Sequence, residues 1–154
     1  MRIGSVGPVA RGRLPALEVE LQPDNEGVRA TNKRFYEALS TQNLLGMEQL
    51  WSHGPHVRCV HPGWKMIEGW DAIRDSWRII FKQSLCLTVE PLDAQVTILG
   101  PAAIVTCREK ITSFTLDGST VTAAQATNVF EKKDGRWHLV HHHASAIPAS
   151  EKPA

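Results

Sequence analysis

The sequence predicts an α+β domain in which three N-terminal helices pack on the concave face of a cone-shaped, curved, antiparallel or mixed sheet. Apolar residues recur at helical spacing up to residue 81, and segments rich in Val, Ile and Thr then follow one another to residue 147. Asp-Gly pairs separate the last of these segments and supply the positive φ that tight hairpins need. We expect the helices to leave a cone whose mouth admits a ligand.

A single domain is expected, because 154 residues lie within the usual size of one domain and suffice for one core. Residues 1–22 carry Gly and Pro without sustained periodicity, so they are predicted to form a flexible or draped arm. The folded domain is expected over residues 23–148, and a short tail over residues 149–154.

Three helices are expected in the first half of the chain. The first begins at Asp24, where the side chain of Asp24 or Asn25 can accept the free N–H groups of a first turn, and it runs to about Thr41. The second is short, and the third begins near Gly69. Each of the last two has one apolar stripe at helical spacing: Leu44, Met47, Leu50 and Trp51, and Trp70, Ile73, Trp77, Ile80 and Phe81.

Extended segments lie on both sides of the third helix. Between the second and third helices, Val57, Cys59 and His61 alternate with Arg58 and Val60, which predicts a short strand that ends before a Pro-Gly turn. After the third helix we expect extended segments over residues 85–89, 94–99, 102–116, 120–132 and 136–147. The last three should be antiparallel neighbours in sequence order.

Charge and composition exclude several partners. With 17 Lys and Arg against 16 Asp and Glu, the net charge of +1 gives little attraction to nucleic acid or to an acidic membrane, so neither is expected. The three widely spaced cysteines, Cys59, Cys86 and Cys107, are expected to be reduced core residues. With no apolar leader segment expected either, the predicted location is cytoplasmic. Neither GxxxxGK[ST] nor GxGxxG occurs, and no cofactor is expected.

The end of the chain carries the motif that points to a family. Asp134-Gly135-Arg136-Trp137, followed by residues 140–145 (VHHHAS), is similar to the D-G-x-W-x-x-V-H-x-H-x-S ending of the calcium/calmodulin-dependent kinase association domain. Together with the order of helices, His-Pro turn and long strands, this resembles the SnoaL-like branch of the nuclear transport factor 2-like superfamily over residues 24–147. That superfamily includes isomerases, dehydratases, hydrolases and noncatalytic assembly domains, so the resemblance implies the fold and leaves the reaction open.

His61 is the candidate catalytic residue. It lies where the resemblance to ketosteroid isomerases places the general base, and a neutral imidazole there could remove a proton α to a carbonyl. The alternative is a structural histidine at the mouth of the cone. The resemblance also implies an oxyanion-binding Tyr on the first helix. The matching place holds Phe35, with Tyr36 turned by about 100° along the helix. Tyr36 is kept as a ligand-binding candidate, and the acid on a late strand has no clear match.

Two histidines of the last strand are further candidates. Period-two alternation places His141 and His143 on the same face as Trp137 and Leu139, and this more apolar face is expected to line the cone. The two imidazoles would then bind an acidic ligand or exchange a proton with it, or serve as structural histidines. With His61 they could form a three-His zinc site. No carboxylate accompanies them in a recognisable motif, and no metal is expected.

Arg108 and Trp64 complete the predicted site. The kinase association domain resembles this stretch in having an Arg on the corresponding strand that lines its pocket, and a guanidinium in a partly dry cone would bind a carboxylate with two hydrogen bonds. The alternative is a solvated residue that pairs with its neighbours Glu109 or Lys110 across the sheet. Trp64 would supply a flat apolar wall.

Two classes of function follow. The first is a small-molecule-binding protein, or a cofactor-free isomerase, dehydratase or cyclase that uses His61 on an apolar, oxygenated or carboxylate-bearing compound. The second is a noncatalytic homo-oligomerisation domain with a vestigial or regulatory pocket. In either case a homodimer is expected through the outer face of the sheet, where Val121, Ala123 and Val129 need a cover.

Overall fold

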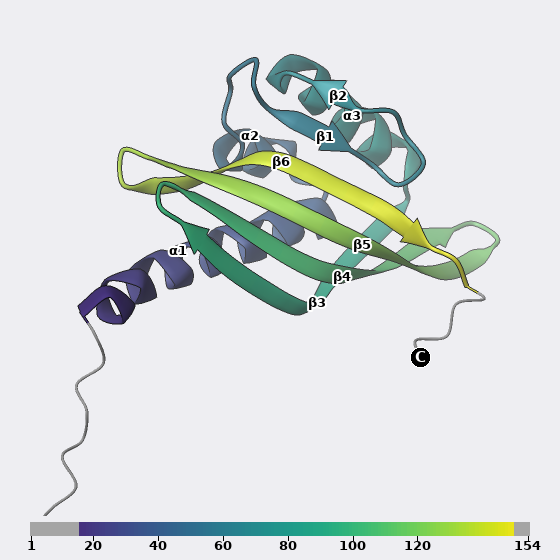
Figure 1. Cartoon of the computed structure of the whole chain (residues 1–154). Helices are drawn as coiled ribbons and strands as arrows, with labels where there is room; N and C mark the ends of the chain where they lie inside the picture. The colour runs from purple at the N-terminus through teal and green to yellow at the C-terminus, as the bar shows by residue number, and fades with distance from the viewer. Residues whose placement is uncertain (1–15, 150–154) are drawn as a thin grey trace, which may run out of the picture.

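A computed structural model describes residues 16–149 of the chain, with side chains from residue 23. Three helices precede or interrupt a sheet of six strands, and the strand order is β2-β1-β6-β5-β4-β3 (Figure 1). The helices are α1 (Ala16–Ser40), α2 (Leu44–Leu50) and α3 (Trp70–Gln83). The strands are β1 (Arg58–Val60), β2 (Ile67–Glu68), β3 (Cys86–Leu99), β4 (Ala102–Thr115), β5 (Gly118–Lys133) and β6 (Arg136–Ile147).

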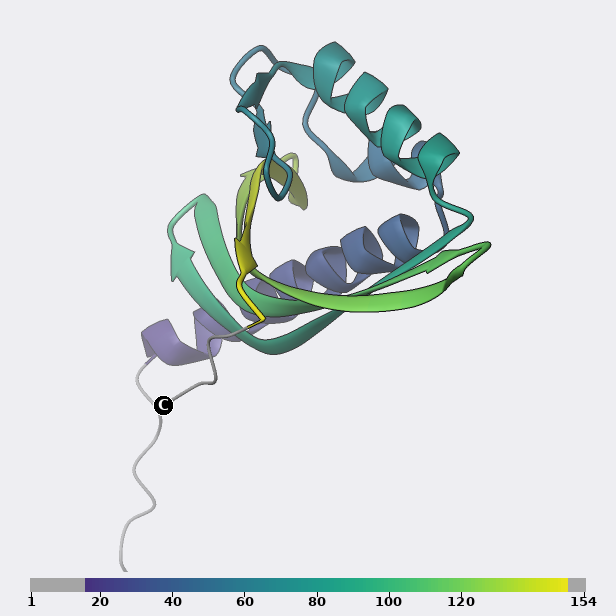
Figure 2. The same ribbon diagram turned by 90° about the vertical axis from the view of Figure 1, so that its right-hand side faces the viewer.

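The sheet is mixed and curved, and it does not close into a barrel. β1 runs parallel to β6, whereas every other neighbouring pair is antiparallel. Figure 2 shows α1 lying along the concave side of the long strands, with α2 and α3 above it beside β1 and β2. The predicted fold class is therefore confirmed, including the antiparallel order of the last three strands.

The first helix begins earlier than predicted. It starts at Ala16 and not at Asp24, so residues 16–22 are helical and the predicted arm is at least seven residues too long. Residues 1–15 lie outside the described part of the chain. The segment Ala16–Gln22 consists mainly of good helix formers, and the helix accommodates Pro23 at the loss of one backbone hydrogen bond. Asp24 instead accepts a hydrogen bond from Lys132, at 2.6 Å.

The second and third helices follow their predicted stripes. Asn43 caps α2, since its Oδ1 accepts a hydrogen bond from the backbone N–H of Gly46 at 2.9 Å. Helix α3 follows Gly69, whose φ of 80° lies in the left-handed region that glycine tolerates best. Met47 and Leu50 of α2 are buried, as are Trp70, Ile73, Ser76 and Trp77 of α3.

One long edge strand replaces two predicted segments. β3 runs through Pro91, which is tolerated because an edge strand leaves backbone N–H groups unpaired on one side. Its pairing with β4 shifts between Leu92 and Gln95, and Asp93 has a φ of 56°. The sequence pattern suggested a gap between two segments, but the strand continues there across a β-bulge. The two-residue strand β2 was not predicted.

A second bulge lies in β6 and decides which side chains face inward. The β5–β6 hairpin turns at Asp134 and Gly135, both with positive φ, as predicted. Val129 then pairs with His141 and Phe130 with Leu139, so Val140 has no partner in the register. One extra residue in a strand exchanges its two faces from that point onward.

The core fills the space between the helices and the concave face. Its largest fully buried side chains include Trp51, Phe35, Phe130, Met47, Ile73 and Leu139. Cys59 and Cys107 are buried as predicted, but Cys86 is exposed at the start of the edge strand, where no element covers it. No helix of the described residues is long and apolar enough to cross a membrane.

Truncation of Leu139 tests this core. Leu139 is 0% exposed, so we expect Leu139→Ala to lower the free energy of unfolding by about 2–5 kcal/mol through lost burial and the cavity it leaves. Leu116→Ala is the matched control, because Leu116 is 93% exposed and its loss should change stability by less than about 0.5 kcal/mol. Urea unfolding of both variants measures the difference, and equal effects would contradict the assigned core.

Candidate functional site

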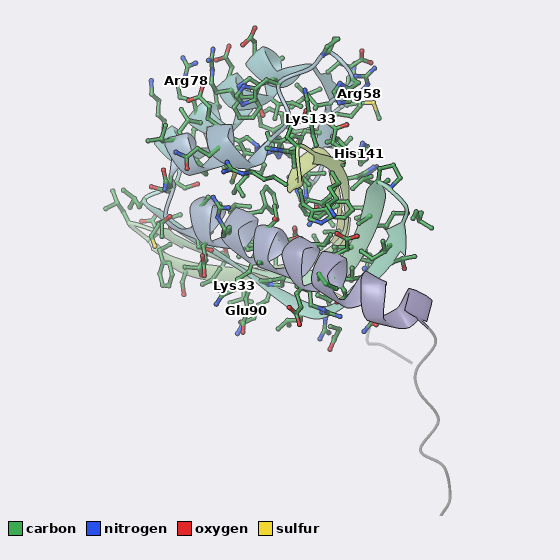
Figure 3. All side chains as sticks on the ribbon, turned by 90° about the vertical axis from the view of Figure 1, so that its left-hand side faces the viewer. Lys33, Arg58, Arg78, Glu90, Lys133 and His141 are labelled. Carbon is green, nitrogen blue, oxygen red and sulfur yellow. The ribbon has the colours of Figure 1, made fainter. Side chains whose placement is uncertain are left out.

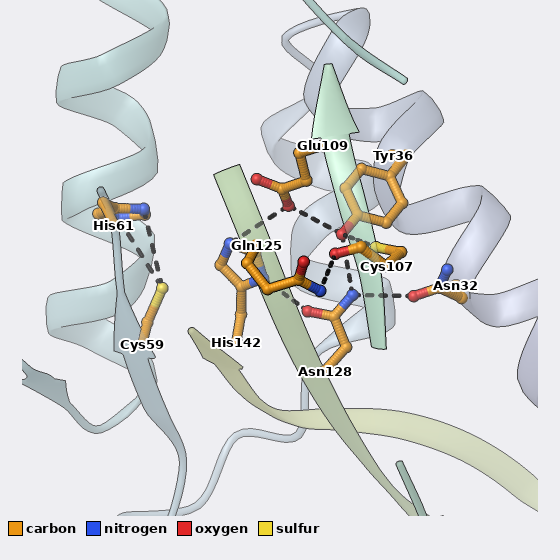
Figure 4. Close-up of polar contacts among 9 residues, drawn as sticks. All are labelled: Asn32, Tyr36, Cys59, His61, Cys107, Glu109, Gln125, Asn128 and His142. Carbon is orange, nitrogen blue, oxygen red and sulfur yellow. Dashed lines mark hydrogen bonds and ion pairs between the residues drawn. The ribbon is translucent and has the colours of Figure 1, made fainter. Parts of the chain in front are cut away.

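A cluster of buried polar side chains lies between α1 and the concave face of the sheet. The buried polar and charged residues are Thr31, Asn32, His61, Ser76, Glu109, Asn128 and His142. Figure 4 shows most of them together with Tyr36, Cys59, Cys107 and Gln125. Polar groups are buried only where hydrogen bonds replace water, so their partners define the chemistry of this cluster.

Asn128, on β5, joins the helix to the sheet. Its Nδ2 donates to Asn32 Oδ1 at 2.9 Å and to the Tyr36 hydroxyl at 3.1 Å, both on α1. Its Oδ1 lies 2.6 Å from Nδ1 of His142, its register partner on β6. An amide oxygen only accepts, so Nδ1 of His142 carries the proton and Nε2 holds a lone pair. Asn128 thereby fixes the tautomer of His142.

Tyr36 and Glu109 form the second link of the cluster. The Tyr36 hydroxyl donates to Glu109 Oε1 at 2.8 Å, and it also lies 3.2 Å from the Cys107 sulfur. Burial raises the pKa of Tyr36 above its ordinary value, and the nearby Glu109 carboxyl adds to this shift. Tyr36 therefore keeps its proton near neutral pH and acts as a hydrogen-bond donor.

Glu109 carries a buried carboxyl group whose pKa lies near neutral pH. Burial raises its pKa to about 7, although the hydrogen bond from Tyr36 acts in the opposite direction. Nε2 of His142 lies 4.0 Å from Oε1. Among the described residues, none makes a hydrogen bond to the other carboxyl oxygen, Oε2. Glu109 can thus both take and give a proton at physiological pH, with one oxygen free to do so.

His61 faces this cluster from the end of β1. The single proton of the Ser76 hydroxyl is donated to the Ile73 carbonyl at 2.7 Å. The hydrogen bond of 2.8 Å between Ser76 Oγ and His61 Nε2 must therefore be donated by the imidazole. Nδ1 of His61 keeps a lone pair, and burial lowers the pKa of the ring to about 4. His61 is a neutral hydrogen-bond acceptor near pH 7.

Trp77 of α3 connects the two buried histidines. Its ring centroid lies 4.4 Å from that of His61 and 6.0 Å from that of His142. Burial, with a smaller contribution from the neighbouring histidines, lowers the pKa of His142 to about 3. Both imidazoles are neutral near pH 7, so the described interior carries no positive charge there. Its charge is zero or, when Glu109 ionises, minus one.

The predicted orientation of the β6 histidines is wrong. Beyond the bulge at Val140, His142 and Ala144 face inward, whereas His143 is exposed and His141 is half-buried on the outer face. Figure 3 shows His141 on the same side of the molecule as Arg58, its register partner on β1. These two histidines and the buried His61 therefore do not meet. In the described residues no group of three or more His, Cys, Asp or Glu side chains could hold a metal ion.

Arg108 also lies outside the cone. It is exposed on the outer face of β4 and pairs with Asp93 at 3.4 Å, not with Glu109 or Lys110. A carboxylate clamp within the cone is thus not formed by this residue. Trp64 is 42% exposed and its ring centroid lies 5.1 Å from that of His61 in a T-shaped arrangement, so it lies at the border of the cluster.

Three central residues were missed by the sequence prediction. Glu109 could have been found, because Val105 and Cys107 alternate toward the core and place Glu109 on the same face. Asn128 could have been found in the same way, from the inward Ala124 and Ala126. His142 could not, because only the bulge directs it inward.

Comparison with known proteins identifies similar chains. The family model of the SnoaL-like domain matches residues 28–150. The F-box protein SKIP8 of Arabidopsis thaliana is 27% identical over 128 residues, which are 83% of this chain and 53% of that protein. The chain therefore spans about half the length of this curated relative.

Two solved structures share both fold and moderate identity. A candidate dehydratase of the NTF2-like family from Streptomyces avermitilis is 29% identical with a TM-score of 0.77, covering 82% of this chain and 98% of that one. A candidate calcium/calmodulin-dependent protein kinase type II association domain from Thiobacillus denitrificans is 26% identical with a TM-score of 0.67. It covers 78% of this chain and 94% of that one.

The raised pKa of Glu109 predicts a pH-dependent contribution to stability. The folded state holds this proton more tightly than the unfolded chain, whose glutamic acid titrates near the ordinary value of 4.5. The contribution of Glu109 to the free energy of unfolding is fully present below pH 4.5 and is lost as the pH rises through about 7. Glu109→Gln removes the dependence, so the variant should gain stability relative to wild type between about pH 5 and about pH 8.

Urea unfolding at the two pH values measures this gain. His61 and His142 have lowered pKa values and stabilise the fold increasingly as the pH rises toward 6.5, but both proteins contain them. Their effect cancels in the comparison. A stability difference that does not change with pH would contradict the buried state of Glu109.

Proposed function

The chain belongs to the SnoaL-like domain family, and from this premise we propose that it binds a neutral, apolar, oxygenated small molecule and acts on it by acid–base catalysis. The reaction class is that of a cofactor-free isomerase, dehydratase or cyclase. Glu109 is the proposed acid–base, in place of the general base that the sequence suggested at His61. The cytoplasmic location stays a prediction.

The observation that carries this proposal is the buried Glu109 carboxyl. Its pKa of about 7 matches the pH at which a general acid or base is most effective, and Oε2 is free of protein partners among the described residues. His61 has a pKa of about 4 and is a much weaker base. Its Nδ1 is suited to accept a hydrogen bond from a ligand hydroxyl, which orients the ligand.

The proposed step is a proton transfer within one ligand. The Glu109 carboxylate removes a proton from a carbon next to a carbonyl, and the electron pair moves toward the carbonyl oxygen. Glu109 then returns the same proton to the ligand. Return to another carbon isomerises the molecule, whereas return to a β-hydroxyl releases water and leaves a double bond. Either outcome restores Glu109 to its starting state, and neither needs a redox partner.

The charge of the interior supports a neutral ligand. A carboxylate entering the cluster would meet Glu109 and no fixed positive charge among the described buried residues, which disfavours it in a medium of low dielectric. A ketone or hydroxyketone would instead meet neutral donors and acceptors, Tyr36 and His61 among them. The likeness to the candidate dehydratase supports the same chemistry at the level of the family.

Proton exchange in deuterated water tests the proposal. A panel of neutral cyclic ketones and β-hydroxyketones is incubated with the protein, and NMR records the loss of α-proton signals and the appearance of enones. We expect exchange to rise with pH through about 7, as Glu109 ionises, and to fall by about 100-fold or more in Glu109→Gln. Arg78→Ala, on the exposed face of α3, is the control.

Wild-type exchange that Glu109→Gln leaves unchanged would overturn the assignment of Glu109. No exchange with any member of the panel, together with no change in melting temperature, would count against small-molecule chemistry as a whole.

We also propose that the chain forms a homodimer through the outer face of its sheet. One row across this face consists of Ile104, Val129, His141 and Arg58 from four adjacent strands, and the next row contains Thr106, Thr127, His143 and Val60. Ile104 and Val129 are only half-buried, so this face leaves apolar surface uncovered in a single chain. The likeness to a kinase association domain supports assembly, which is the second candidate function.

A charge placed in this face tests the dimer. Val129→Glu should convert a dimer to a monomer, because two copies would bury an unpaired carboxylate at the contact. Light scattering after size exclusion measures the mass. Leu116→Glu, at a position that is 93% exposed in the β4–β5 turn, should leave the mass unchanged. A monomeric wild type at micromolar concentration would refute the proposal.

A further inference from the structure

A second concave site lies beside α1, on the N-terminal side of Tyr36. It is a groove between α1 and the strands β3 and β4, with a volume of about 140 Å³. The helix contributes Arg29, Asn32 and Lys33, while the strands contribute apolar side chains. Neither the predicted site nor the proposed function uses this groove.

The bulge in β3 shapes the floor of the groove. Ala94 lies within the register shift of β3. It forms part of the floor of the groove, together with Val96 and the fully buried Val105. A bulge bends a strand and changes the direction of its side chains. The result is a patch of small apolar surface beneath one face of a polar helix.

Asn32 provides an unused hydrogen-bond donor in this groove. The residue is 4% exposed, and its Oδ1 accepts the hydrogen bond from Asn128. Its Nδ2 makes no hydrogen bond to any residue that the structure describes, and Figure 4 shows this nitrogen on the side away from Asn128. Nδ2 is not among the fully enclosed atoms that lack a partner, so it is open to an acceptor atom from outside the chain.

Two cations stand at the rim, one helical turn apart. Arg29 is held by a hydrogen bond from its Nε to Asn25 Oδ1 at 2.8 Å. Its two terminal nitrogens make no hydrogen bond to any residue that the structure describes. Lys33 Nζ lies 3.7 Å from Glu37 Oε1. This exposed ion pair contributes little to stability, so Lys33 can exchange Glu37 for another anion. Figure 3 shows Lys33 on the outside of α1.

We propose that this groove binds a small monocarboxylate of about the size of benzoate. The apolar part lies on Ala94 and Val96, and the carboxylate accepts hydrogen bonds from Asn32 Nδ2 and from the rim cations. A cavity of about 150 Å³ holds one benzene ring, which sets the size of the apolar part. The apolar floor favours an organic acid over a free phosphate, which would leave that surface bare.

The groove and the interior cluster select opposite ligands. Arg29 and Lys33 attract an anion, whereas the interior presents the Glu109 carboxyl and repels one. In this proposal Arg29 and Lys33 of α1 bind the carboxylate, in place of Arg108, which the sequence suggested. This inference does not depend on the proposed reaction: Asn32 belongs to both the groove and the buried cluster, but it has no chemical role in the proton transfer.

Ligand titration followed by NMR tests the groove. Benzoate is added to the ¹⁵N-labelled full chain, with benzamide as the uncharged analogue of the same shape. We expect benzoate to shift the side-chain amide signals of Asn32 and to bind about tenfold more tightly than benzamide, with an affinity that falls as salt is raised. Arg29→Ala/Lys33→Ala should lose about tenfold in benzoate affinity. Arg78→Ala, on the exposed face of α3, should lose none.

Val96→Phe provides a second variant, since it fills the floor and should abolish binding while both cations remain. Equal affinity for benzoate and benzamide would overturn the carboxylate assignment. Benzoate shifts confined to His61, Tyr36 and Glu109 would place the acid in the interior and overturn the groove. A double variant that binds benzoate as wild type does would also overturn it.

Discussion

The amide of Asn128 is the constraint on which the interior depends. It is fully buried, and each of its hydrogen-bonding groups has a partner, on α1 through Asn32 and Tyr36 and on β6 through His142. An unpaired buried group of this kind would destabilise the fold by about 1–3 kcal/mol, so the helix can take only the position that satisfies it. The same amide sets the proton of His142 and leaves the Tyr36 hydroxyl to donate to Glu109. The amide of Asn128 thus both positions α1 on the sheet and sets the hydrogen bonding of the buried cluster.

Most of the architecture could be predicted from the sequence, because it rests on periodicity and on turn residues. The stripes of α2 and α3 and the Asp-Gly hairpin turn at Asp134 translate directly into structure. The errors arise where one local signal overrides another. Residues 1–22 showed no sustained periodicity and were predicted to be an arm, yet the helix formers before Pro23 continue α1 back to Ala16. Two separate segments were expected over residues 85–89 and 94–99, yet β3 runs through Pro91, because an edge strand tolerates the missing N–H.

The site was harder to predict because side-chain direction depends on register. Strict alternation carries Glu109 inward beside Cys107, so this carboxyl was within reach of sequence reasoning. Alternation fails in β6, where the unpaired Val140 turns His142 inward and His143 outward. Nothing in a run of three histidines indicates which ring will be buried. The pairing with β5 decides it, and that pairing involves residues about fourteen positions away.

The bulged strand β3 has a further consequence at the level of many molecules. Its free edge presents Pro91, which has no N–H to offer, and then Asp93, whose backbone turns out of the strand. The opposite edge of the sheet is β2, only two residues long. Both outer strands therefore offer another chain only a short or interrupted ladder, which disfavours edge-to-edge growth into fibrils. The faces of the sheet, and not its edges, are thus the surfaces on which a second copy could pack.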